Sequence, residues 1–214
     1  SVFSRLRALL LFDHAPFSFC LVPFALLLGA GASQAAEQPY PSKPVRLLVG
    51  FSPGGGTDVA ARIITKKLAE MWGQQVVVDN RAGAGGLLAF EMTAKANPDG
   101  YTLLASSPSF AIQPGLASKL PYDPIRDFAP ITQASAAPYI LVLHAGVEAK
   151  SVKELISLAK ANPGKLNYAS GGIGSAQHLA AELFNLMAGI NMVHVPFKGA
   201  VSIPDVIAGR VQMV

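Results

Sequence analysis

Apolar and polar residues alternate over the first half of the chain in a pattern that predicts three strands separated by two helices. Short apolar runs of strand length are followed by longer stretches in which apolar residues recur at helical spacing, and Gly73 is placed to end the first helix. The predicted strands are 45–51, 75–80 and 101–106, and the predicted helices are 59–71 and 85–96. Strands separated by single helices form a mainly parallel sheet with helices on both faces, so this half predicts an α/β fold.

A proline-rich stretch at 120–131 interrupts the pattern, and the alternation resumes after it. The elements predicted there are a strand at 137–144, a helix at 151–161 capped by Ser151, a strand at 165–170, a helix at 175–187, a strand at 191–197, a helix near 203–208 and the beginning of a strand at 211–214. We therefore expect two α/β lobes, at 41–137 and 138–214. Because an α/β domain rarely ends on an uncovered strand, we also expect that a C-terminal portion is missing.

Composition narrows the possible functions. The chain of 214 residues is 51% hydrophobic and 14% charged, and its formal net charge of +4 is spread along the sequence, which argues against a nucleic-acid-binding surface. Residues 1–35 carry Arg5 and Arg7 before an apolar run and small residues near Ala35, which is typical of a secretory signal peptide. The single cysteine, Cys20, lies in that segment, so the rest of the chain has no cysteine for a disulfide or a metal site.

Two glycine loops, FSPGGGTD at 51–58 and GGIG at 171–174, each lie between a predicted strand and a predicted helix. Neither is followed by the lysine of a phosphate-binding P-loop, and neither has the complete G-x-G-x-x-G spacing of a dinucleotide site. Each loop is expected to present free backbone N–H groups at a helix start, with Thr57 or Asp58 and Ser175 as caps, and such groups favour a carboxylate. The alternative is that the glycines only permit tight turns and close packing.

Several segments then resemble a known family. They are YPSKPVRLLVGFSPGGGTDVAAR, VVVDNRAGAGG, NPDGYTLL, LPYDPIRDFAPI, NYASGGIGSAQHLAAELF and VHVPFKGA. These motifs, in this order, are similar to those of the Bug family of extracytoplasmic solute receptors, also called TctC-like substrate-binding proteins of tripartite tricarboxylate transporters. The resemblance implies a two-lobed periplasmic-binding-protein fold of the Venus-flytrap type 2, with the return to lobe 1 missing. It also implies a periplasmic receptor that binds a small carboxylate or related solute for membrane permease subunits, without catalysis, metal or cofactor.

The resemblance also implies a set of ligand-binding residues around an interlobe cleft. These are Phe51, Ser52, Pro53, Gly54, Gly55, Gly56, Thr57 and Asp58 in the first loop, Gly172, Ile173, Gly174, Ser175 and His178 in the second, and Phe197, Lys198 and Gly199 in the segment that follows. Phenylalanine at 197 stands where the family usually has tyrosine. Ser106 and Ser107 follow the third predicted strand and are added to the set as cleft residues.

Other interpretations remain beside these. Asp58 is also suited to capping its helix, His178 to packing beneath the loop, and Arg81 to pairing with Asp79. A sensor module that acts on a signalling partner is one alternative function. An α/β hydrolase is disfavoured because there is no G-x-S-x-G motif and no motif places an acid beside Ser175 and His178.

Overall fold

A computed structural model describes residues 39–198 and 202–214. Two expectations fall outside the described residues: the signal peptide at 1–35, which contains Cys20, and the ligand residue Gly199.

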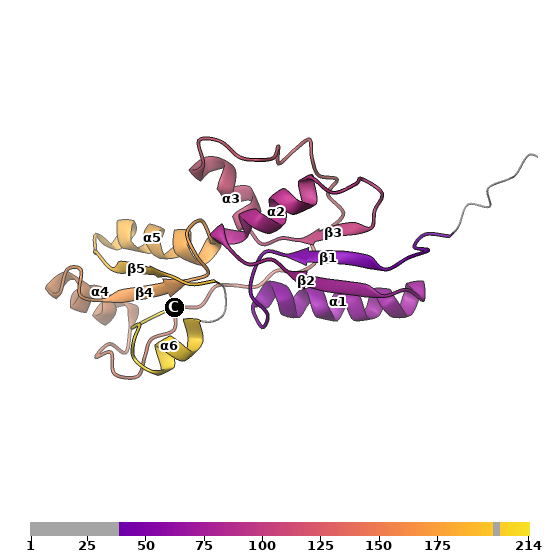
Figure 1. The fold of residues 1–214 in the computed structure, drawn as a ribbon. Helices are drawn as coiled ribbons and strands as arrows, with labels where there is room; N and C mark the ends of the chain where they lie inside the picture. The colour runs from indigo at the N-terminus through magenta and orange to yellow at the C-terminus, as the bar shows by residue number, and fades with distance from the viewer. Residues whose placement is uncertain (1–38, 199–201) are drawn as a thin grey trace, which may run out of the picture. The chain divides into compact units, whose positions relative to one another are not determined.

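The first half of the described chain forms a three-stranded parallel sheet. Its strands are β1 (Val45–Val49), β2 (Val76–Asn80) and β3 (Thr102–Ala105), in the order β2-β1-β3. The helices are α1 (Gly56–Trp72), α2 (Leu87–Ala94) and α3 (Ser109–Leu116), and a short 3₁₀ turn, η1 (Ala84–Gly86), precedes α2. Figure 1 shows α1 on one face of the sheet and α2 and α3 on the other. The predicted parallel α/β pattern is therefore confirmed for this half.

The central position of β1 explains its composition. Val45, Leu48 and Val49 are fully buried because the strand has a neighbour on each side and helices above and below. Leu47 and Val49 pack with Ala61 of α1 in one core cluster, which fixes the helix against the sheet. The carboxyl end of this buried strand leads directly into the first glycine loop, so the loop rises from a rigid support.

The second half contains a two-stranded parallel sheet of β4 (Asn167–Ser170) and β5 (Val193–Pro196). Its helices are α4 (Val152–Ala161), α5 (Ala176–Ala188) and α6 (Ile203–Ile207). A second core cluster joins Leu155 of α4 to Tyr168 of β4 and to Met213 near the end of the chain. Ser151 caps α4 as expected, since its hydroxyl accepts a hydrogen bond from the backbone N–H of Glu154.

Three local predictions were wrong. Residues 137–144 do not form a strand, although backbone hydrogen bonds join Val142 to Val214 and His144 to Gln212 around an isolated bridge between Leu143 and Met213. Residues 211–214 likewise have no assigned strand, although Met213 also forms an isolated bridge to Tyr168 of β4. An apolar run becomes a strand only where a neighbour completes its ladder, and residues 129–142 are exposed along their whole length.

Helix α3 was not predicted, because Pro114 in its last turn gives the sequence signal of a break.

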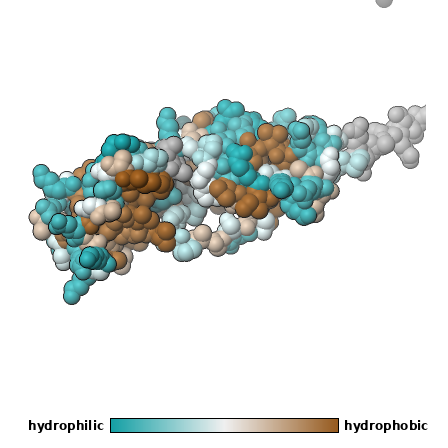
Figure 2. All heavy atoms as spheres, turned by 90° about the horizontal axis from the view of Figure 1, so that it is seen from below, coloured by the Kyte–Doolittle hydropathy of each residue, from teal (hydrophilic) through white to brown (hydrophobic). Residues whose placement is uncertain are grey.

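Exposed apolar side chains occur on several elements. On α1 they include Val59, Ile63 and Met71, and Figure 2 shows apolar patches on the face seen from below. Among the described residues, no helix has both the length and the apolar character needed to cross a membrane.

Candidate functional site

The first glycine loop, Phe51–Gly55, ends at a helix start without a side-chain cap. Gly55 is the N-cap residue of α1 and accordingly offers no side-chain acceptor, so the predicted caps Thr57 and Asp58 were wrong. The N–H groups of the first helical turn have no acceptor within the helix itself. Among the described atoms, nothing lies within 4 Å of the position that a Cβ would take on Gly54 or Gly56. The loop therefore combines N–H donors with open space beside them.

Asp58 lies beneath this loop and is almost completely buried, with 2% of its surface exposed. Its carboxylate accepts hydrogen bonds from the Gly54 N–H at 2.9 Å, from Arg62 Nε at 2.9 Å and from Asn80 Nδ2 at 2.8 Å. Burial by itself would raise the pKa of Asp58, but the hydrogen bonds from Arg62, Gly54 and Asn80 outweigh it and lower the pKa to about 2. Both carboxylate oxygens thus bind groups of the protein itself.

The second glycine loop, 171–174, leads into a helix start that is capped. Ser175 is the N-cap residue of α5, and its hydroxyl accepts from the backbone N–H of His178 at 3.3 Å, which confirms the predicted cap. The Gly174 N–H donates to His178 Nδ1 at 3.3 Å, and the Gly172 N–H donates to the Ser170 hydroxyl at 3.1 Å. The expectation that both loops present free N–H groups is therefore wrong for Gly172 and Gly174, and also for Gly54, whose N–H donates to Asp58.

His178 belongs to a column of three stacked rings. Its ring lies 4.1 Å from that of His194, centroid to centroid, and the ring of His194 lies 4.9 Å from that of Tyr168. Ser170 Oγ is 2.6 Å from His194 Nε2, and the Tyr168 hydroxyl donates to Glu182. Burial lowers the pKa of His194, and the neighbouring His178 lowers it further. The column supports the second loop from below, in line with the alternative that His178 packs under the loop.

The structure brings the first part of one loop close to the first part of the other. A Cβ on Gly171 would lie 3.6 Å from the Phe51 ring, and the Ser52 hydroxyl donates to the backbone carbonyl of Lys198. Phe197 follows β5, and its N–H donates to the Ser170 carbonyl at 3.0 Å. The Phe197 side chain packs against the core cluster of Ala169, Val206 and Val211.

The other predicted ligand residues make few contacts with the rest of the site. Pro53 and Ile173 are exposed at the tips of their loops, and Ser106 is exposed after β3. Ser107 Oγ lies 2.6 Å from the hydroxyl of Ser109, which is fully buried. Within the described part of the chain, no hydrogen bond joins Ser106 or Ser107 to either glycine loop.

Two features of this region were missed from the sequence. The segment Ala82–Gly86 packs on the second loop so closely that a Cβ on Gly85 would lie 2.6 Å from the Ile173 carbonyl oxygen. Gln113 of α3 fills the space beside it, donating to the Ala84 carbonyl at 3.1 Å, and a Cβ on Gly174 would lie 2.5 Å from its Nε2. The repeated glycines of NRAGAGG were the available signal, because close backbone contact excludes larger residues. No pattern in the sequence indicated that Gln113 would pack beside the second loop.

Charged groups near the end of β2 form a separate cluster. Arg81 pairs with Asp79 at 2.8 Å, as expected, and Arg46 binds the same carboxylate at 2.5 Å. Burial by itself would raise the pKa of Asp79, but the contacts with Arg81 and Arg46 outweigh it and lower the pKa. A shallow groove of about 490 Å³ runs along this strand, but it is lined by residues 44–46 and 77–80 and includes neither glycine loop. In residues 39–198 and 202–214, no three His, Cys, Asp or Glu side chains are grouped as a metal site would need.

Solved structures define the class of this fold. A structure described as "R. palustris Rpa4515 with adipate" is 38% identical, with a TM-score of 0.78, over 81% of this chain and 59% of that chain. One described as "MatC (Rpa3494) from Rhodopseudomonas palustris with bound malate" is 32% identical, with a TM-score of 0.73, over 81% and 60% of the two chains. "Structure of periplasmic binding protein BugD" is also 32% identical, with a TM-score of 0.74, over 81% and 58%. The chain has the α/β fold of periplasmic solute-binding proteins.

Sequence relatives identify the family. Residues 60–214 match the family described as "Tripartite tricarboxylate transporter family receptor", TctC, and the chain belongs to this family. Protein BugT of Bordetella pertussis is 39% identical over 191 residues, which are 88% of this chain and 58% of BugT. The "UPF0065 protein in tcbD-tcbE intergenic region" of Pseudomonas sp. (strain P51) is 40% identical over 195 residues, or 90% and 58%. The resemblance to the Bug family is thus confirmed, and the chain spans less than two thirds of the length of these relatives.

Proposed function

We propose that this chain is the solute-binding part of a receptor that captures a small carboxylate-type solute outside the cytoplasmic membrane. The observation that carries the proposal is the uncapped start of α1, where the glycine loop leaves open space beside the first-turn N–H groups. Family membership supports the receptor class. The relatives described with adipate and with malate support a carboxylate as the ligand.

The physical basis is the preference of a helix start for negative charge. The helix dipole contributes about 0.3–1 kcal/mol for an anion at this position. Each hydrogen bond to a charged group adds roughly 1.5–3 kcal/mol, so two N–H donors would suffice to orient one carboxylate. The second loop donates through fewer groups, because His178 and Ser170 already bind the N–H groups of Gly174 and Gly172. We therefore assign the main anion contact to α1.

The proposed mechanism is closure of the two lobes, 41–137 and 138–214, around the solute. The contacts of Phe51 with Gly171 and of Ser52 with Lys198 are of the kind that a closed state gains. Permease subunits of a tripartite transporter would then bind the closed form. In this scheme Asp58 and Ser175 are buried and support the two helix starts from within. The other predicted ligand residues of both loops line the cleft with Phe197 and Lys198, and Ser106 and Ser107 lie at its edge.

A hydrolytic role is not supported by the arrangement of Ser175 and His178. The serine hydroxyl caps α5, and the histidine Nδ1 accepts from Gly174. A nucleophile and its base would instead require the imidazole to accept the proton of the serine hydroxyl.

Titration with dicarboxylates tests the proposal. We expect adipate or malate to raise the melting temperature of the purified chain in a concentration-dependent way, and isothermal calorimetry to give a saturable heat. Adipamide, which has the length of adipate without its charges, is the control and should bind much more weakly. Equal effects of adipate and adipamide, or no effect of any carboxylate, would contradict the proposal.

A further inference from the structure

Arg62 and Asn80 connect three parts of the chain beneath the first glycine loop. Asn80, the last residue of β2, donates from Nδ2 to the Phe51 carbonyl at 2.9 Å and to Asp58 at 2.8 Å. Arg62, on α1, donates from Nε to Asp58 at 2.9 Å and from Nη2 to Asn80 Oδ1 at 3.1 Å. Asp58 in turn accepts from the Gly54 N–H at 2.9 Å. A closed set of hydrogen bonds therefore ties both ends of the loop to the strand and the helix.

We propose that Arg62 and Asn80 are positioning residues of the carboxylate site, an assignment that rests on the proposed function. The amide of Asn80 and the Nε and Nη2 groups of Arg62 bind Phe51, Asp58 and each other, so these contacts hold the loop from beneath. Their effect on the ligand passes through the backbone that they hold. A loop that is already ordered loses less conformational freedom when it binds, and this increases affinity.

Arg62 has a second effect, which is electrostatic. Asp58 belongs to the first turn of α1, so its negative charge lies at the same helix start that is to receive a ligand carboxylate. Like charges this close repel each other, and the guanidinium of Arg62 offsets the charge of Asp58 by direct contact. Asn80 is neutral and has only the geometric effect. The two residues can therefore be separated by their dependence on salt.

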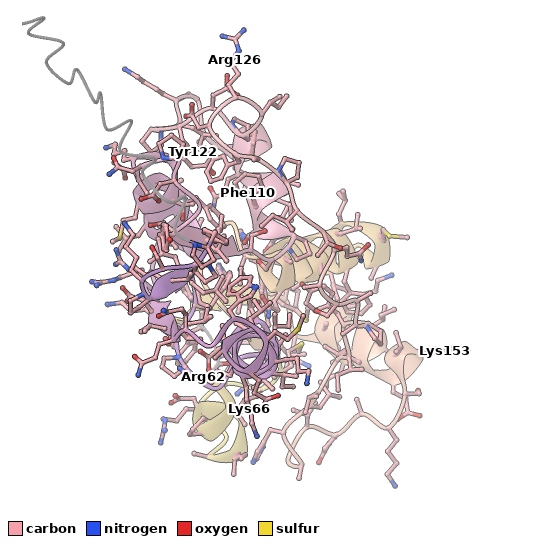
Figure 3. The ribbon with its side chains drawn as sticks, turned by 90° about the vertical axis from the view of Figure 1, so that its right-hand side faces the viewer. Arg62, Lys66, Phe110, Tyr122, Arg126 and Lys153 are labelled. Atoms are coloured by element: carbon pink, nitrogen blue, oxygen red, sulfur yellow. The ribbon has the colours of Figure 1, made fainter. Side chains whose placement is uncertain are left out.

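The first experiment compares Arg62→Gln with Lys66→Gln. Both residues project from α1, which is seen end-on in Figure 3, and each substitution removes one positive charge, but only Arg62 contacts Asp58. With adipate and malate as probes, we expect Arg62→Gln to weaken binding ~tenfold at an ionic strength of about 0.01 M, and ~threefold at about 1 M, where repulsion is screened. Lys66→Gln should stay within about twofold of the unmodified protein at both salt concentrations. Equal losses in the two variants would overturn the role of Arg62.

Two further variants separate charge from geometry. Arg62→Lys keeps the charge and loses the two-point contact, so it should remove the salt dependence and recover part of the affinity. Asn80→Ala should weaken binding ~fivefold. The ratio of its dissociation constant to that of the unmodified protein should be the same at low and at high salt. Asp79→Asn, a change at the preceding residue, which binds Arg46 and Arg81, is the control and should leave affinity unchanged. A salt-dependent loss in Asn80→Ala would contradict a purely geometric effect.

Hydrogen exchange distinguishes failure of this inference from failure of the proposed function. Without any ligand, Asn80→Ala should accelerate exchange of the amide hydrogens in residues 51–57, of which Pro53 has none, and leave exchange in α4 unchanged. If the unmodified protein binds no carboxylate while this acceleration is observed, the proposed function fails and the ordering of the loop by Asn80 stands. If the unmodified protein binds adipate or malate but exchange at 51–57 is the same in both proteins, the positioning role is overturned.

Discussion

Replacement of Asp58 by asparagine should destabilise the folded protein by about 2 kcal/mol at neutral pH. The Asp58 carboxylate is 2% exposed and accepts hydrogen bonds from Gly54, Arg62 and Asn80. Its pKa of about 2 compares with 3.8 for an unperturbed aspartate, and each pKa unit corresponds to about 1.36 kcal/mol. Asp58→Asn keeps the shape of the side chain but removes the charge and replaces one acceptor oxygen by an NH2 donor, which then faces other donors.

The pH dependence gives the prediction its sign. Because the pKa of Asp58 is lower in the folded state than in the unfolded state, its contribution is fully present above about pH 4 and is lost as the pH falls toward about 2. The difference in stability between the unmodified protein and Asp58→Asn should therefore be largest near neutral pH and shrink across this interval. For a domain of this size, about 2 kcal/mol corresponds to a melting temperature lower by about 4–8 °C.

Thermal denaturation followed by circular dichroism between pH 2.5 and 7 measures this difference. Asp99→Asn is the matched control, because Asp99 also accepts a backbone N–H and pairs with a lysine, Lys43, but is exposed. This control should change stability by less than about 0.5 kcal/mol. A melting temperature of Asp58→Asn equal to that of the unmodified protein at pH 7, or a difference that persists unchanged at pH 2.5, would refute the reasoning.

Three other substitutions test separate parts of the structure. Gly56→Val fills the open side of the first loop and should weaken adipate binding more than ~tenfold by calorimetry, whereas Lys153→Ala on the outward-facing side of α4 should not change it. Ser151→Ala removes the cap of α4 and should lower the unfolding free energy by ~0.5–2 kcal/mol in urea titrations. Gly85→Ala should destabilise by ~1–3 kcal/mol because its Cβ would meet backbone, whereas Gly115→Ala, in open space within α3, should be neutral or stabilising. A Gly85→Ala variant as stable as the unmodified protein, or a larger loss of stability in Gly115→Ala than in Gly85→Ala, would contradict the packing described here.

Much of the fold could be predicted from the sequence because its signals are local. Strand β1, VRLLV, is apolar at every position except Arg46, and Gly73 ends α1 in the left-handed conformation that glycine adopts easily. The strand expected at 137–144 failed because a strand depends on its neighbour as well as on its own pattern. Helix α3 was missed because Pro114, in its last turn, gives the local signal of a break.

The site was predictable only in part, for the same reason. Glycines between a strand and a helix indicated where a ligand can approach the backbone, and Ser175 was recognisable as a cap. The contacts of Asn80 with Phe51 and of Arg62 with Asn80 join residues 29 and 18 positions apart, which no local pattern reveals. The same holds for His178, whose acceptance of the Gly174 N–H depends on the exact path of the second loop.

The uncapped beginning of α1 has a consequence for how such a protein diversifies. Donors that belong to the peptide group are the same for every amino acid except proline, so most substitutions in the coding sequence cannot delete them. Natural or engineered substitutions can then change the side chains around the rest of the solute, while the backbone N–H groups continue to bind its acid group. Libraries built to change the cargo should accordingly spare residues 54–58 and randomise positions outside that turn.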